Sequence, residues 1–121
     1  MTTHQDPTEE VFVVERPWGN FRQFTSGKPV TVKIVTVLPG HRLSLQTHAQ
    51  RSEYWFVLDG PLTVTVDDDK RSVAAGESVW VPVGATHRMA NEGTEPVRIL
   101  ELGVGAFDEA DIVRLQDDYR R

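Results

Sequence analysis

The sequence contains no cysteine among its 121 residues. This absence excludes disulfides, iron–sulfur clusters, zinc sites built on thiolates and thiol nucleophiles. Basic residues are also outnumbered, because 13 lysines and arginines face 18 acidic residues and leave a formal net charge of −5. An acidic domain is poorly suited to hold a phosphate backbone, so we expect no nucleic-acid partner.

Long apolar runs are lacking as well. No stretch approaches the ~20 apolar residues that span a bilayer. The opening residues, MTTHQDPTEE, lack the basic and apolar regions of a signal peptide. The length suits one domain. We therefore expect a soluble, cytoplasmic, single-domain protein with no membrane partner.

What the chain does contain is a series of short apolar runs separated by Gly, Pro, Asn and Asp, which is typical of an all-β fold. A spacing of about ten residues per strand favours a sandwich or a small barrel. Residues 1–10 have nothing to bury and are expected to be a disordered or loose lead before a single domain over 11–121. The predicted strands are Val11–Glu15, Asn20–Thr25, Val30–Leu38, Leu43–His48, Glu53–Asp59, Leu62–Val66, Lys70–Val73, Ser78–Val83, His87–Ala90 and Val97–Leu102.

The tail is the one segment with a helical pattern. Between Asp108 and Tyr119, the apolar residues Ile112 and Leu115 fall on the same helical face as Tyr119. The sequence therefore predicts an all-β fold that ends in a short C-terminal helix.

Two segments carry glycines, a proline and ligand-type side chains at regular offsets. The first is Gly40-HRLSL-Gln46-Thr-His48-AQRS-Glu53-YWFVLD-Gly60, and the second is Gly76-ESVWV-Pro82-Val-Gly84-AT-His87-RMA-Asn91. These segments resemble the two conserved motifs of the cupin barrels, with Gln46 in the place of the family's usual first histidine. The resemblance implies a cupin double-stranded β-helix, that is, a jelly-roll barrel.

The resemblance also implies a metal centre. Gln46 and His48 stand two apart on a strand and share a face, while Glu53 begins the next strand and His87 comes from a separate hairpin. One amide oxygen, two imidazole nitrogens and one carboxylate suit a single divalent ion such as Zn²⁺, Mn²⁺, Co²⁺, Ni²⁺ or Fe²⁺. The alternative is that both histidines are ordinary polar residues on a half-exposed sheet.

The exchange of histidine for Gln46 indicates what such an ion would do. A neutral amide donates less electron density than imidazole does, so the ion stays a stronger Lewis acid toward oxygen ligands. Such a site favours holding the neighbouring oxygens of a sugar over redox chemistry with O₂.

Further segments narrow the resemblance to one cupin branch, the C-terminal domain of type II mannose-6-phosphate isomerases. In that family this domain usually follows a nucleotidyltransferase domain that makes GDP-mannose. That half is absent from this sequence, so a stand-alone isomerase domain is expected and GDP-mannose synthesis is not. The segments that carry the resemblance are Arg16-Pro17-Trp18-Gly19, Val32–Val37, Leu43–Gln46, Arg51–Trp55, Ser78–Pro82, Gly84–Arg88 and Asp111–Arg114.

This resemblance implies the interconversion of mannose 6-phosphate and fructose 6-phosphate through an enediol-like intermediate, within carbohydrate metabolism and polysaccharide biosynthesis. Two alternatives stay open: a non-catalytic cupin that binds a sugar phosphate or nucleotide sugar, and a metal-dependent oxidoreductase. Cupin barrels often dimerise by exchanging edge strands, which also protects sheet edges. A homodimer is expected by analogy.

Strand parity suggests which residues contact the substrate. Lys33 shares a face with apolar neighbours and is expected at the barrel mouth as a phosphate or hydroxyl ligand, or else is an ordinary lysine at a strand start. Arg42 and Ser44 share the parity of Gln46 and are expected to line the same cavity, with Arg42 as the first choice for the phosphate.

Two residues are candidates for the catalytic machinery. Arg51 sits between His48 and Glu53, where it is either a solvated loop arginine or a residue that orients Glu53. Glu101 lies on the last predicted strand, at a position where the resembling family also carries a carboxylate. If it faces the interior it could have the raised pKa that a general base needs, and otherwise it is a salt-bridged edge residue.

Overall fold

The computed structural model of the chain describes residues 11–106, 108 and 110–119. The expected lead, residues 1–10, lies outside the described residues. Within the described part, the regular secondary structure consists of antiparallel strands. In chain order these are β1 Phe12–Arg16, β2 Gly19–Gln23, β3 Val30–Val37, β4 Leu45–Thr47, β5 Arg51–Val57, β6 Leu62–Val66, β7 Asp69–Val73, β8 Ser78–Val81, β9 His87–Ala90, β10 Val97–Gly105 and β11 Val113–Gln116.

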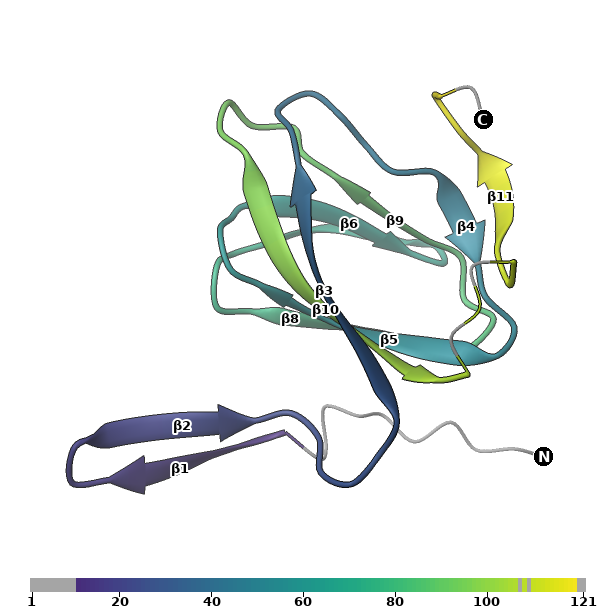
Figure 1. Cartoon of the computed structure of the whole chain (residues 1–121). Coiled ribbons are helices and arrows are strands. Elements are labelled where there is room, and N and C mark those ends of the chain that lie inside the picture. The colour runs from purple at the N-terminus through teal and green to yellow at the C-terminus, as the bar shows by residue number, and fades with distance from the viewer. Residues whose placement is uncertain (1–10, 107, 109, 120–121) are drawn as a thin grey trace.

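Two sheets form the body of the molecule (Figure 1). The first is four-stranded in the order β3-β10-β5-β8, and the second is five-stranded in the order β11-β4-β9-β6-β7. The strands β1 and β2 form a separate two-stranded hairpin that projects away from the two sheets. The predicted all-β architecture is confirmed.

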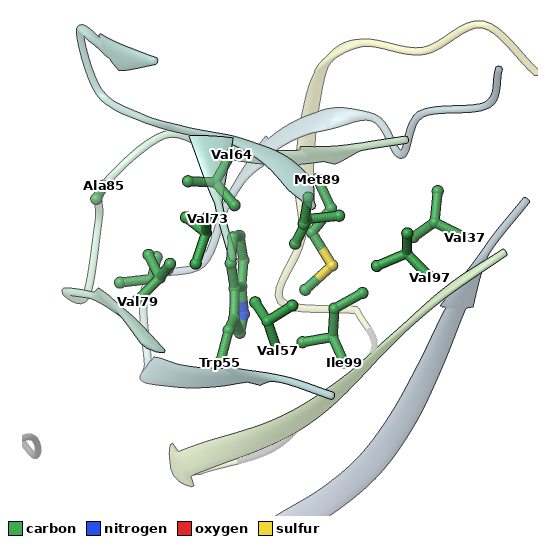
Figure 2. Packing of buried hydrophobic residues seen from close by; sticks show 12 residues of the cluster. Val37, Trp55, Val57, Val64, Val73, Val79, Ala85, Met89, Val97 and Ile99 are labelled. Carbon is green, nitrogen blue, oxygen red and sulfur yellow. The ribbon is translucent and has the colours of Figure 1, made fainter. Parts of the chain in front are cut away.

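The core lies between the two sheets, and it is formed by the apolar side chains that point inward from their strands. On β5, Trp55 and Val57 point inward, and on β10 their neighbour Ile99 does the same; all three are almost completely buried. Figure 2 shows the Trp55 indole in the middle of this cluster, with Val79 on one side and Met89 on the other. Alternation with period two thus places one face of each sheet in the core.

The prediction of a C-terminal helix is wrong. Residues 113–116 form β11, which pairs antiparallel with β4 through Val113↔Thr47 and Arg114↔Gln46 (Figure 1). Leu115 and Tyr119, two residues of the supposed apolar helical face, remain 52% and 43% exposed. An apolar stripe that finds nothing to cover does not stabilise a helix, whereas the edge of β4 offers unpaired backbone groups.

One glycine allows the chain to enter this C-terminal segment. Gly105, at the end of β10, has a φ of +115°, and a Cβ on it would lie 2.8 Å from the Gln50 carbonyl oxygen. Only glycine tolerates both conditions. The chain therefore passes directly beside the turn that joins β4 to β5, and the C-terminal segment comes to lie against that turn.

Among the described residues, no helix is long and apolar enough to cross a membrane.

Candidate metal centre

Three potential metal ligands converge between the sheets. Glu53 comes from β5, His87 from β9, and His48 from the residue directly after β4. One ligand atom from each of the three lies within 4.8 Å of the others, and each residue is 3–4% exposed. The sequence prediction brought these residues together from two distant motifs, and the structure places them side by side.

Both imidazoles are oriented as metal ligands are. Nδ1 of His48 lies 2.8 Å from the Asp111 carbonyl oxygen, and Nδ1 of His87 lies 3.1 Å from the Ala85 carbonyl oxygen. A carbonyl oxygen only accepts, so each Nδ1 carries a proton, and in the neutral ring Nε2 keeps the lone pair that an ion would take. Both Nε2 atoms face Glu53, at 3.2 Å for His48 and 3.7 Å for His87. Two neutral imidazoles and one carboxylate fit a divalent transition metal ion.

Gln46, the fourth predicted ligand, lines the same cavity. It lies on β4 directly opposite His87 on β9, so the two side chains share the inward face of the second sheet. Gln46 therefore lies beside His87 among the residues that line the cavity.

The Glu53 carboxylate is held in place by its neighbours. Nε1 of Trp55 donates to one oxygen at 2.9 Å, and Nε of Arg51 donates to the other at 3.3 Å. Burial alone would raise the pKa of Glu53, but the hydrogen bond from the protonated form of His48, the charge of protonated His87 and the bond from Trp55 outweigh it and lower that pKa to about 2. Glu53 is therefore ionised, as a metal ligand must be.

The pKa values of the two histidines shift in opposite directions. Burial disfavours the charged form of both rings. For His48 the effect of burial is outweighed by the hydrogen bond to Glu53, the hydrogen bond to the Asp111 carbonyl oxygen and the Glu53 charge together, so its pKa is raised, whereas for His87 burial prevails and lowers the pKa. A metal ion competes with a proton for these Nε2 lone pairs, so His87 is the ring more readily available to an ion.

Arg51 is the first residue of β5 and is buried, with 5% of its surface exposed. Its guanidinium also lies 3.2 Å from Nε2 of His48, and it donates to the Asp108 carbonyl oxygen at 3.3 Å. Of the two readings left open by the sequence, the structure therefore excludes a solvated loop arginine: Arg51 contacts two of the three potential ligands.

Glu101 faces the same cavity from β10. It pairs with Trp55 on one side and with Lys33 of β3 on the other, so these three residues form a row on the inward face of the first sheet. Burial and the nearby charge of Glu53 raise the pKa of Glu101 to about 7, against the opposing effect of Lys33. The predicted interior position of this carboxylate is what the structure shows.

The structure brings two of the three predicted substrate residues to the cavity. Lys33 lines it, and so does Ser44, which is 2% exposed. Arg42 does not, because it forms a bidentate ion pair with Asp118 at 2.6 and 3.0 Å and lines a different depression on the outside of the second sheet.

Two cavity residues, Ile112 and Arg114, were not among the predicted site residues. Both belong to the C-terminal segment that was interpreted as a helix. The signal that could have found them is their spacing of two, which in an extended strand places both side chains on one face.

Comparison with known families matches residues 3–117 to the family described as "Mannose-6-phosphate isomerase C-terminal". The chain belongs to this family. Two curated relatives are similar over 109 residues, or 89% of this chain: the mannose-1-phosphate guanylyltransferase of Escherichia coli K12, at 40% identity, and the alginate biosynthesis protein AlgA of Pseudomonas aeruginosa PAO1, at 42%. The chain spans 23% of the length of each of these relatives.

A solved structure supports the fold. The cupin 2 conserved barrel domain protein from Salinispora arenicola superposes with a TM-score of 0.58 at 24% identity, over 71% of this chain and 69% of that one. The predicted cupin barrel is therefore confirmed as the fold of this member of the mannose-6-phosphate isomerase C-terminal family. Membership fixes neither the ion nor the substrate.

Proposed function

We propose that this chain is a metal-dependent sugar-phosphate isomerase that interconverts mannose 6-phosphate and fructose 6-phosphate. The observation that carries the proposal is the presence, in one cavity, of a two-histidine, one-carboxylate ligand set and a second buried carboxylate, Glu101. The ligand set and the second carboxylate have separate tasks in an aldose–ketose isomerisation. Family membership and the cavity together favour this reaction over others that cupins host.

The ion is assigned to His48, Glu53 and His87, with Gln46 beside them. When bound, a divalent ion polarises a carbonyl group and stabilises negative charge on neighbouring sugar oxygens. Zn²⁺, Mn²⁺, Co²⁺, Ni²⁺ and Fe²⁺ all accept this mixture of nitrogen and oxygen ligands.

Glu101 is proposed as the general base and acid. In the direction from aldose to ketose, its carboxylate takes the proton from C2 of the open-chain sugar, and an enediol forms between C1 and C2. The same proton returns to C1, while the O2 hydroxyl loses a proton and O1 gains one, so that no atom is gained or lost overall. A carboxyl group can carry out both transfers because it lies on the inward face, beside the ligand set and shielded from bulk water.

Arg51 is proposed as a positioning residue. Its guanidinium contacts Glu53 and His48, and it ties both to the C-terminal segment through the Asp108 carbonyl oxygen. A cation at this place also favours the ionised form of Glu53.

The proposal is tested with a coupled assay that reports fructose 6-phosphate formed from mannose 6-phosphate, in the presence of each candidate ion. Glu101→Gln should lower kcat by about 10²- to 10⁴-fold, because it removes the proton acceptor, while the affinity for the ion is retained. The matched control is Glu95→Gln, an exposed glutamate that does not line the cavity. Unchanged turnover in Glu101→Gln would remove this residue from the mechanism.

The same preparation separates the two alternatives. Tight binding of mannose 6-phosphate without turnover, with any of the five ions, would show a sugar-phosphate-binding protein in place of an isomerase. Oxygen consumption by the Fe²⁺-loaded protein would show a cupin oxidoreductase.

A further inference from the structure

The cavity changes in charge and burial from its inner end to its mouth. At the inner end, the three potential metal ligands are 3–4% exposed and Glu101 is 9% exposed. Lys33 and Gln46 are half-buried, and Arg114 is exposed at the rim. The carboxylates of the cavity therefore lie at its inner end, and the cationic side chain of Arg114 lies at its opening.

Strand register explains this gradient. Across the second sheet, Arg114 on β11 lies opposite Gln46 on β4, and Gln46 lies opposite His87 on β9. Across the first sheet, Lys33 on β3 lies opposite Glu101 on β10. Because β3 and β11 are the edge strands of their sheets, each inward row ends in a cation at the edge.

We propose that Arg114, together with Lys33, forms a phosphate subsite at the cavity mouth. Within the described part of the chain Arg114 has no side-chain hydrogen bond or ion pair, whereas Arg51 is engaged with Glu53 and Arg42 with Asp118. The planar guanidinium of Arg114 is therefore available to a phosphate, and its fork matches two phosphate oxygens.

The position of the subsite fits a hexose that carries its phosphate on the sixth carbon. Neighbouring strands lie about 4.8 Å apart, so the backbone of Arg114 stands about 10 Å from that of His87, two strand spacings away. A six-carbon sugar with O1 and O2 near the ligand set reaches across a comparable distance.

This subsite rests on the proposed function, because it names the part of the substrate that Arg114 selects. Arg114→Gln removes a charge-assisted hydrogen bond, and should raise the KM for mannose 6-phosphate by about 10- to 100-fold. Any turnover of unphosphorylated mannose should stay unchanged, and Arg114→Lys should recover part of the loss. The matched control is Arg71→Gln, on the exposed strand β7 outside the cavity.

A binding measurement separates failure of the subsite from failure of the isomerase proposal. Calorimetry with mannose 6-phosphate and with mannose, on the ion-loaded chain, needs no turnover. Preferential binding of the phosphorylated sugar that is lost in Arg114→Gln supports the subsite even if the chain is catalytically inert. Equal affinity in the wild type and in Arg114→Gln, or equal affinity for both sugars, overturns it.

Discussion

Replacing Trp55 by phenylalanine tests how the barrel core holds the metal centre. The indole Nε1 donates to Glu53 at 2.9 Å, and the ring lies edge-on to His87 with its centroid 5.6 Å away. Trp55→Phe keeps an aromatic ring in the core but removes the donor that fixes the Glu53 carboxylate. Loss of such a partner of a metal ligand costs about 10- to 100-fold in ion affinity, equivalent to about 1.4–2.7 kcal/mol.

The same change also affects folding, and the two effects can be measured separately. Trp55 is 1% exposed, so the smaller phenyl ring leaves a gap among its neighbours. We expect the ion-free variant to lose about 1–2 kcal/mol of unfolding free energy in urea. Ion affinity is measured at low temperature and without urea, where both proteins are folded, by competition between the protein and a chelator for Zn²⁺.

Trp80→Phe is the matched control. Trp80 lies on β8 directly opposite Tyr54, on the outward side of the first sheet, and does not line the cavity. This variant should bind Zn²⁺ as the wild type does. If Trp55→Phe also binds Zn²⁺ within about twofold of the wild type while remaining folded, the argument that Trp55 positions a metal-binding Glu53 fails.

Three further outcomes are expected. Asn91→Asp should lower the unfolding free energy by about 2–4 kcal/mol in urea titrations, since the buried amide donates to the Val37 carbonyl oxygen at 2.9 Å and to a second carbonyl, and a carboxylate can donate to neither. Hydrogen bonds from Arg42 lower the pKa of Asp118. The unfolding free energy lost in Asp118→Asn should therefore be constant above the unfolded-state pKa of about 3.9 and shrink as the pH falls through the lower folded-state pKa. A loss of unfolding free energy that grows on acidification would contradict this sign. Gly60→Ala should destabilise by about 1–3 kcal/mol, because a Cβ there would lie 2.5 Å from a backbone nitrogen, and an unchanged urea midpoint would show that the turn adapts freely.

Local patterns predicted most of the strands. In β6, Leu62 and Val64 are buried and alternate with Thr63 and Thr65, and this period of two is visible in the sequence without any knowledge of the partners. The metal ligands were found in a different way, because His48 and His87 are 39 positions apart and only the resemblance to a known pair of motifs placed them together. The structure then added the two backbone carbonyls that orient the rings.

The C-terminal segment shows where local patterns fail. Ile112, Leu115 and Tyr119 fit a helical face, but they also fit a strand with one irregularity, and β11 does have a register shift between Arg114 and Gln116. What decides between helix and strand is the open edge of β4, which is a tertiary feature. Because this segment was interpreted as a helix, Arg114 was not predicted to line the cavity.

The assignment of Arg42 failed because strand parity was extended too far. β4 begins only at Leu45, and both Leu43 and Ser44 line the cavity although they are consecutive. Alternation is therefore interrupted before β4, and the parity of Gln46 says nothing about Arg42. Its actual partner, Asp118, lies 76 positions away and could not be inferred from spacing.

The most direct test of the central claim is the stoichiometry and location of a bound ion. Crystals of the chain grown with Mn²⁺ and measured for anomalous scattering should show one ion per chain, contacted by Nε2 of His48, Nε2 of His87 and a carboxylate oxygen of Glu53, and His87→Ala should abolish it. An empty cavity at saturating Mn²⁺ and at saturating Zn²⁺, or an ion bound elsewhere, would contradict the account.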